Sequence, residues 1–278
     1  MILGIGLMTV LQGLSMNTRE RRQQILELVQ VNRSVTNEDL QQEFNVTKET
    51  IRKDLNVLSE SGNIIRTFGG AIFREEYDPS FEQRRTSNLD EKRQIAKEAA
   101  KLIEANDIIA LDSSSTTFEL ANLLTREKEL VVLTNSLKVL NVLAKLHTVT
   151  AISTGGILRN RSLSFQGEAA RNTIDTYNIR KAFISAKALD IEKGIMDSNE
   201  GEAAVKRIML EKAQDVTLLV DHAKLDHMAH VTVCPVSRIN RIITSTLADA
   251  QTMEKFRQAG IDVRIVAFPP MENNGYNR

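Results

Sequence analysis

Tryptophan is absent from this sequence of 278 residues, and cysteine occurs once, at Cys234. A single cysteine excludes an internal disulfide framework and fits a reducing cytoplasm, where we expect the protein to be located. The cysteine and four scattered histidines also give no metal-ligand cluster of the usual spacing. The sequence therefore predicts neither a metal nor another cofactor.

Net charge is missing as well, because 36 basic residues balance 36 acidic ones. This balance does not exclude nucleic-acid binding, since binding needs basic residues on one face rather than over the whole chain. The chain is long for a single core. Its length favours one small domain joined to one medium domain.

Long apolar runs are lacking too, and none reaches the roughly 20 residues that a membrane helix needs. Residues 1–15 are apolar, but no positive charge precedes them as in an export signal, and Arg19, Arg21 and Arg22 follow them. We interpret residues 1–15 as a disposable extension before a start at Met16. A weak interfacial anchor is the less favoured alternative, and no membrane partner is expected.

The N-terminal part has the pattern of a helix-turn-helix. Residues 17–32 have the apolar spacing of a helix, and Thr36 is a suitable N-cap for a short helix after it. Thr47 then caps another helix, which is expected to stop at Gly62. The apolar positions of this last helix recur at helical spacing and face inward: Ile51, Leu55 and Leu58.

Basic residues lie near the start of this last helix, as in helices that read the major groove of DNA. Two β-prone stretches around Arg66 and the Gly69-Gly70 pair then predict a β-hairpin wing. A solvated charged helix and a protein-interaction module are the alternatives, but the order of the elements favours binding to double-stranded operator DNA. The expected DNA-binding residues are Thr47, Lys48, Glu49, Thr50, Arg52, Lys53, Arg66 and Gly69.

The rest of the chain has a different pattern of expected secondary structure. Residues 74–89 are polar, contain a proline and lack periodicity, and are expected to form a linker. After a helix around 90–105, strand-like and helical stretches alternate, which predicts a mostly parallel, doubly wound α/β sheet. The expected strands are Ile108–Leu111, Leu130–Leu133, Val149–Ser153, Ala182–Ser185, Val216–Val220, Ile239–Thr244 and Val263–Val266.

Polar residues gather where these strands end, and ligands of such sheets bind beyond the carboxyl ends of the strands. Five consecutive hydroxyl residues follow Asp112 and enter a helix, which favours a phosphate cradle over an oversupplied helix cap. Arg159 and Lys224 would neutralise a phosphate dianion. The expected effector-binding residues are Asp112, Ser113, Ser114, Ser115, Thr116, Thr117, Asn135, Gly155, Gly156, Arg159 and Lys224.

One long motif is specific. The stretch V-T-K-E-T-I-R-K-D-L-N-V-L-S-E-S-G-N-I-I-R-T-F-G-G-A resembles the signature of the DeoR family of bacterial regulators. Family segments of the second half follow in order as D-S-S-S-T-T, T-N, G-G-I-L-R and D-H-A-K, so the resemblance runs from Met16 to about Phe268. The sequence departs from the family at Ser114, where glycine is usual, at Lys187, where a small residue is usual, and in D-H-A-K-L-D.

The resemblance implies an order of domains. A winged helix-turn-helix is expected over 16–73 and the linker over 74–89. A sugar-phosphate-sensing α/β domain of the ribose-5-phosphate-isomerase-like fold is expected over 90–268, and a disordered tail over 269–278.

The resemblance also implies a function. The chain is expected to be a homodimeric or homotetrameric repressor of a carbohydrate-utilisation operon, released from its operator by a phosphorylated sugar. Lys187 joins the effector-binding residues as a contact to an extra acidic group on the ligand, although a solvated lysine fits equally well. The main alternative is an isomerase-like enzyme fused to a DNA-binding head. Its acids and bases would be Asp112, Asp197, Glu200 and Lys187, but no carboxylate pair with tuned pKa values is evident in the sequence.

Overall fold

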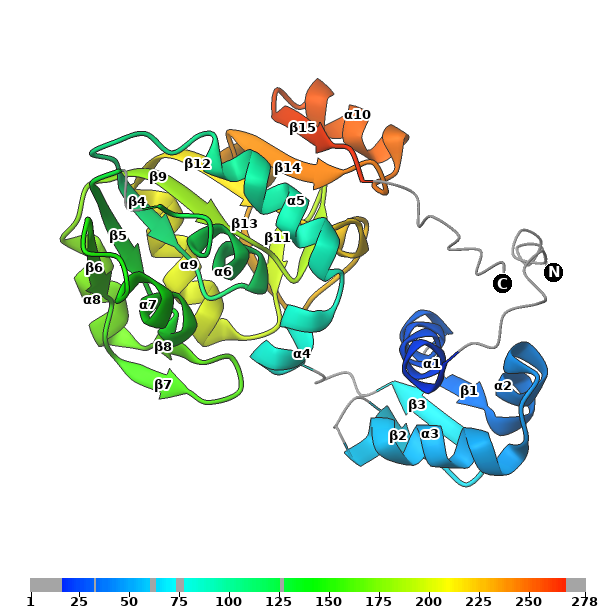
Figure 1. Cartoon of the computed structure of the whole chain (residues 1–278). Coiled ribbons are helices and arrows are strands. Elements are labelled where there is room, and N and C mark those ends of the chain that lie inside the picture. The colour runs from blue at the N-terminus through cyan, green and yellow to red at the C-terminus, as the bar shows by residue number, and fades with distance from the viewer. Residues whose placement is uncertain (1–16, 33, 61–63, 74–77, 126–127, 269–278) are drawn as a thin grey trace, which may run out of the picture. The chain divides into compact units, whose positions relative to one another are not determined.

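A computed structural model describes residues 17–32, 34–60, 64–73, 78–125 and 128–268 (Figure 1). Contacts within the chain divide it into two units, Met1–Asp78 and Pro79–Arg278. The expected extension over 1–15, the expected helix stop at Gly62 and the expected tail over 269–278 lie outside the described residues. No described helix has the length and apolar character that crossing a bilayer requires.

The N-terminal unit contains the predicted helix-turn-helix and wing. Its core is formed by buried apolar side chains from every helix and from the sheet, including Ile25, Leu40 and Leu55. Thr36 caps the second helix through a capping box with Asp39, as expected from the sequence. The elements are α1 (Thr18–Asn32), β1 (Ser34–Thr36), α2 (Asn37–Phe44), α3 (Lys48–Glu60), β2 (Ile64–Arg66) and β3 (Gly70–Phe73), and the antiparallel sheet has the order β1-β3-β2.

The second unit is organised around a seven-stranded sheet in which each strand pairs in parallel with its neighbours. All the strands predicted from the sequence are in it. Because parallel strands are buried on both faces, they are continuous apolar runs and stand out in a sequence. The strands are β4 (Ile108–Leu111), β5 (Leu130–Thr134), β6 (Val149–Ser153), β9 (Ile179–Ile184), β12 (Ala213–Leu219), β14 (Arg241–Ser245) and β15 (Asp262–Val266).

The spatial order β15-β14-β12-β9-β4-β5-β6 reverses direction beside β4. The chain runs outward from β4 through β5 to β6 and then returns to the other side of β4 with β9. Ligands of open α/β sheets bind at such a reversal, beyond the carboxyl ends of the strands. The loops after β4 and β9 are therefore at the centre of the candidate site.

Helices cover both faces of the sheet, as a doubly wound fold requires (Figure 1). Adjacent residues of β4 point to opposite faces: Ile109 packs in the cluster of α5, α6 and α7, and Ala110 in the cluster of α8 and α9. Phe256 of α10 joins α9 on that second face. The bounds are α5 (Leu89–Ala100), α6 (Ser115–Ala121), α7 (Leu137–Leu143), α8 (Glu168–Asp175), α9 (Glu200–Lys212) and α10 (Ala250–Gln258).

Several short elements were not predicted from the sequence. They form a hairpin, a small antiparallel sheet and two single turns of 3-10 helix next to the large sheet. Each strand or turn has only three or four residues, too few for a periodic pattern. They are β7 (Ile157–Arg159), β8 (Ser164–Gln166), β10 (Ala188–Asp190), β11 (Gly194–Asp197), β13 (Val231–Cys234), η1 (His222–Lys224) and η2 (Val236–Arg238).

The expected linker over 74–89 is wrong in its second half. Residues Phe81–Thr86 form helix α4, which belongs to the second unit. Ser80 starts this helix with a capping box, and the buried ring of Phe81 packs edge-on against Phe118 with 5.5 Å between the ring centroids. One apolar anchor in a short polar segment leaves no helical period, so only the tertiary contact reveals the helix.

Candidate functional site

The exposed start of α3 carries the predicted major-groove residues. Thr47 caps the helix, and its Oγ1 accepts from the backbone N–H of Thr50 at 3.2 Å and lies 2.9 Å from the Thr50 Oγ1. Lys48 and Lys53 are exposed, and Arg52 forms an ion pair with Glu49 at 3.2 Å. All these charges lie in solvent, where such pairs contribute little and are easily exchanged for phosphate.

A buried carboxylate, which the sequence did not point to, holds α3 in place. Asp54 lies on the inner side of α3, and its two oxygens accept from Arg21 Nε and Arg22 Nε of α1, each at 2.7 Å. The Asp54 side chain is 2% exposed. A charged residue among the inward positions Ile51, Leu55 and Leu58 is the signal that could have indicated this contact.

The wing is the turn between β2 and β3. Gly69 O accepts from the N–H of Asn37 at 2.8 Å, which fixes the wing to the start of α2. Arg66 is half-buried in β2, and its Nη1 is buried with no hydrogen-bond partner among the described residues. Phe68, which the sequence did not point to, has a fully exposed side chain at the tip of the wing. Proteins that bind the minor groove use arginine and often insert an apolar side chain such as phenylalanine.

At the reversal of the sheet, Asp112 is fully engaged by the protein. One carboxylate oxygen accepts from the N–H of Ser114 at 3.0 Å and from Thr117 Oγ1 at 2.8 Å. The other accepts from the N–H of Ser185 at 2.9 Å and lies 3.3 Å from Lys206 Nζ. Asp112 therefore shapes the loop and joins β4 to β9 across the reversal.

Lys206 was missed by the sequence analysis. Its ammonium also lies 2.5 Å from Asp197 Oδ2. Burial lowers the pKa of Lys206, but the carboxylates of Asp197 and Asp112 outweigh it and hold this pKa above its ordinary value. Lys206 and Glu202 occupy buried positions of α9 one turn apart, and two charged residues on an apolar helix face are a signal that could have found them.

The five hydroxyl residues after Asp112 are all buried, and they divide into two groups. Ser114 caps α6, its Oγ lies 2.8 Å from Thr117 Oγ1, and Ser115 Oγ donates to Arg84 O at 3.2 Å. These three hydroxyls are structural. The hydroxyls of Ser113 and Thr116 have no hydrogen-bond partner in the described part of the chain.

On one side of the reversal, Asn135 follows β5 and its amide donates to Phe165 O at 3.2 Å, while its Oδ1 is buried with no partner among the described residues. Gly156 follows β6 with φ 105°, and a Cβ there would lie 2.4 Å from Gln166 O. Glycine is therefore required for β8 to approach. Arg159 of β7 donates to Ser162 Oγ at 3.2 Å and lies 3.9 Å from Glu202.

On the other side, Lys224 follows β12, in the turn that Asp221 begins. From β12 to β6 there are four steps across the sheet, or about 19 Å at ~4.8 Å per strand. Lys224 and Gly155 are too far apart to hold one phosphate. Lys187, before β10, is half-buried between these two sides, and its N–H donates to Met196 O at 3.0 Å.

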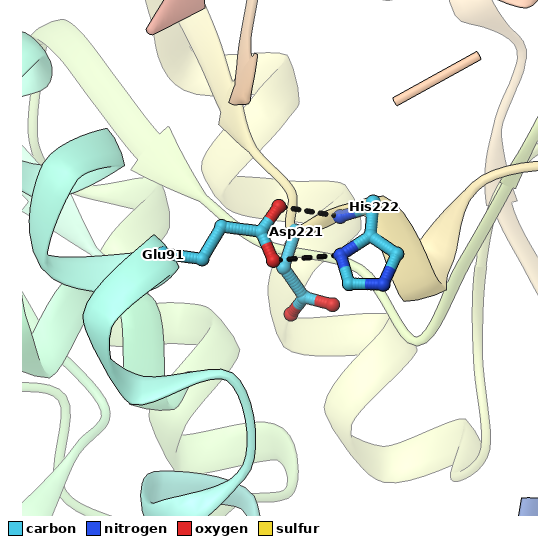
Figure 2. A group of neighbouring side chains, drawn as sticks. All are labelled: Glu91, Asp221 and His222. Carbon is cyan, nitrogen blue, oxygen red and sulfur yellow. Dashed lines mark hydrogen bonds and ion pairs between the residues drawn. The ribbon is translucent and has the colours of Figure 1, made fainter. Parts of the chain in front are cut away.

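Glu91 of α5 lies beside Asp221 and His222 at the carboxyl end of β12 (Figure 2). The ring Nδ1 of His222 and its backbone N–H donate to the two oxygens of Glu91 at 2.7 and 2.9 Å. Ser245 Oγ donates to Glu91 Oε1 at 2.7 Å. The ligand atoms of the three side chains lie within 4.8 Å of one another, so the folded chain offers a metal geometry that sequence spacing did not indicate.

The charges around this cluster oppose a cation. Burial raises the pKa of Asp221, but Lys224 and Lys92 outweigh it and hold this pKa below its ordinary value. Asp221 Oδ1 also accepts from Asn88 Nδ2 at 3.0 Å. The carboxylates already have partners, and the cluster is better suited to holding α5 against the end of β12 than to binding a metal.

Comparisons with known proteins agree with this division of the chain. The family model described as "DeoR-like helix-turn-helix domain" matches residues 21–77, and the one described as "DeoR C terminal sensor domain" matches residues 87–246. Over 253 residues the chain is 34% identical to the putative aga operon transcriptional repressor of Escherichia coli O157:H7, covering 90% of this chain and 94% of that protein.

Two further similarities are more distant. The chain is 28% identical over 240 residues to the glycerol-3-phosphate regulon repressor of Escherichia coli K12, covering 86% of this chain and 95% of that protein. Among solved structures, ribose 5-phosphate isomerase A of Methanocaldococcus jannaschii is similar with a TM-score of 0.38 and 21% identity, over 50% of this chain and 55% of that one.

Proposed function

The chain belongs to the DeoR family of transcriptional regulators, and we propose that it represses a carbohydrate-utilisation operon until a phosphorylated sugar releases it from its operator. The names of the two relatives support this proposal, since one is a repressor of an operon and the other of the glycerol-3-phosphate regulon. We place the protein in the cytoplasm, where its DNA is.

The observation that carries the DNA-binding half is the construction of α3 and the wing. A capped helix exposes Lys48, Arg52 and Lys53 on its first turns, while its other face is fixed to α1 through Asp54. A rigid helix with exposed cations fits the major groove, and Arg66 and Phe68 in the wing would lie against the neighbouring backbone or minor groove.

We place the effector at the reversal of the sheet. Its phosphate would lie near Ser113, Thr116 and Lys224, and its sugar hydroxyls would extend toward Asn135 and the loop of Gly155 and Gly156. The length of this edge suits a ligand with a charged end and a polar end. Arg159 and Lys187 are the candidate contacts to the sugar part, on the side away from Lys224.

A homodimer or homotetramer would place two α3 helices in successive major grooves of a repeated or palindromic operator. The effector would favour a different arrangement of the DNA-binding units in the oligomer, in which their affinity for the operator is lower. A coupling of about 1–3 kcal/mol between the two sites lowers the affinity roughly 5- to 150-fold, which is enough for a regulator.

Fluorescence anisotropy on DNA from upstream of this gene, titrated with sugar phosphates and with the same sugars lacking phosphate, tests the proposal. Tight binding that one phosphorylated sugar releases would support it and identify the effector. Tight binding that no sugar phosphate changes would support the proposed DNA binding and contradict the proposed sensing of a sugar phosphate. Turnover of a sugar phosphate by the purified protein would favour the isomerase-like enzyme instead.

A further inference from the structure

Helix α4, in the segment expected to be a linker, carries an arginine that has no ion pair with any described residue. The guanidinium carbon of Arg84 lies 5.8 Å from the centroid of the Phe81 ring. Its Nε and Nη2 are buried and have no hydrogen-bond partner among the described residues. Arg84 as a whole is half-buried, but buried donors without an acceptor are costly, and such donors point to an anion that the protein binds from outside.

A second cation lies next to it. Lys92 is buried at the start of α5, and its Nζ donates to Arg84 O and to Ser87 O, each at 2.6 Å. The pKa of Lys92 is lowered to about 8, mainly by burial and also by the charges of Lys224 and Arg84, against the opposing effect of Asp221 and Glu91. Since Lys224 and Arg84 both act on Lys92, three cationic side chains lie within electrostatic range of one another at this place.

The nearby carboxylates do not remove this excess. Glu91 is hydrogen-bonded to His222 and Ser245, and both Glu91 and Asp221 act on Lys92. These two carboxylates are outnumbered by three cationic side chains, Arg84, Lys92 and Lys224. The balance favours a ligand with negative charge over a metal ion or a neutral sugar.

The Arg84 backbone and the Lys92 ammonium also lie beside the hydroxyl loop. Ser115 Oγ donates to Arg84 O, the same carbonyl that accepts from Lys92. This carbonyl therefore connects α4 to the loop after β4 and to α5. The unused hydroxyls of Ser113 and Thr116 belong to that loop.

We propose that Arg84, Lys92 and Lys224 form the subsite for the phosphate of the effector, with Arg84 as its main hydrogen-bond donor. This inference rests on the proposed function, and it goes beyond the hydroxyl loop by adding a helix from outside the sheet. Arginine suits the role because its planar donors bind phosphate oxygens two at a time.

The position of α4 gives the subsite a regulatory meaning. The boundary between the two units is at Asp78, and α4 begins at Phe81. A phosphate bound by Arg84 is thus held by the first helix after the DNA-binding unit. Ligand binding at Arg84 would therefore change how firmly α4 packs against the rest of the second unit.

The test compares Arg84→Met with Arg85→Met in the full chain. Arg85 is the neighbouring arginine of α4, 45% exposed and paired with Glu82 at 3.0 Å, so it is a matched control. Inorganic phosphate is the probe, measured by calorimetric titration and by its effect on the melting temperature, with chloride at equal ionic strength as the reference.

We expect phosphate to stabilise the wild type and Arg85→Met alike, and to bind Arg84→Met about 10- to 100-fold more weakly. Without phosphate, Arg84→Met should melt no lower than the wild type, because the two buried nitrogens that it removes have no hydrogen-bond partner among the described residues. Arg84→Lys, which keeps the charge but not the planar fork, should bind phosphate with intermediate affinity. Equal binding by Arg84→Met and the wild type, or no specific phosphate binding by the wild type, overturns the subsite.

DNA release separates this inference from the proposed function. If a sugar phosphate releases the wild type and Arg84→Met from DNA at the same concentration, the subsite is wrong and the proposed function stands. If phosphate binding depends on Arg84 but no sugar phosphate releases DNA, the subsite stands and the proposed sensor function is wrong.

Discussion

In the N-terminal unit the buried carboxylate of Asp54 has two guanidinium partners, whereas in the second unit the buried nitrogens of Arg84 have none among the described residues. The cations of the two candidate sites also differ in exposure. Lys48 and Arg52 are exposed at the start of α3 in the first unit, whereas Lys92 is buried in the second. Exposed charges are screened by salt, and buried ones are screened much less. The difference suits a long polyanion in one unit and a small anion in the other.

The largest effect is expected from removing a buried charge that has partners in the second unit. Lys206→Met would leave the buried carboxylates of Asp112 and Asp197 facing each other without a cation. We expect the unit to lose about 3–5 kcal/mol of its free energy of unfolding, measured by urea denaturation. Lys212→Met, which removes a pair with the exposed Asp175, is the control and should lose less than about 1 kcal/mol. A small loss in Lys206→Met would mean that Lys206 is not needed to hold the two carboxylates.

The matching change in the N-terminal unit is Asp54→Asn. It weakens the contact with Arg21 and Arg22, which are 11% and 32% exposed, so solvent reduces the loss to about 2 kcal/mol. Operator affinity should fall because α3 is no longer fixed to α1, while calorimetric binding of a sugar phosphate should be unchanged. Glu27→Gln, at an exposed position of α1, is the control. Full operator affinity in Asp54→Asn would show that the ion pairs do not orient α3.

Exposed charges should respond to salt. Arg52→Ala is expected to weaken operator binding by about 1–3 kcal/mol and, if Arg52 contacts a phosphate, to reduce the salt slope by about one. Sugar-phosphate binding should be intact. Lys224→Ala should weaken sugar-phosphate binding and leave operator binding intact. The result is a repressor that binds DNA but does not respond to the inducer. Loss of both activities in both folded variants would contradict the separation of the two units.

The smallest expected effect is a pH dependence. Without a ligand, Lys92 loses its charge as the pH rises through about 8, because its pKa is lowered by burial and by Lys224 and Arg84, against Asp221 and Glu91. Phosphate favours the charged form, so its affinity should fall between pH 7.5 and 9, with proton uptake on binding.

The sign of the accompanying stability change follows from linkage. The unfolded chain binds more protons than the phosphate-free protein between about pH 8 and the ordinary lysine pKa, so the stability of the phosphate-free protein should rise with pH there. Calorimetry in buffers of different ionisation enthalpy measures the proton uptake. The same dependence in Lys92→Met would assign it to another group.

The sequence predicted those parts of the structure that depend on the local pattern of residues. The seven parallel strands and the caps at Thr36 and Thr47 each depend on residues within a few positions of one another. The parts that depend on distant contacts were not predicted. Helix α4 is held by Phe118, and Lys206 acts on Asp112, which lies far away in the sequence.

The hydroxyl loop illustrates the limit within the candidate site. Its composition favoured a phosphate cradle, but Ser114, Ser115 and Thr117 have partners in the protein. A sequence gives the number of hydroxyls and not the number of partners that the fold supplies. For the same reason the sequence indicated no role for Arg84, since only the folded chain shows that two of its buried nitrogens have no hydrogen-bond partner among the described residues.

The wing has a consequence for how such a protein could acquire a new operator. A Cβ on Gly70 would lie 2.0 Å from Val35 O, so this position has room for glycine alone. A Cβ on Gly69 would meet nothing within 4 Å, and Phe68 is fully exposed. If the wing contacts DNA as proposed, DNA preference can therefore vary through Phe68 and Gly69 without disturbing the fold, while Gly70 stays fixed. A library randomised at these two positions would alter recognition and keep the scaffold.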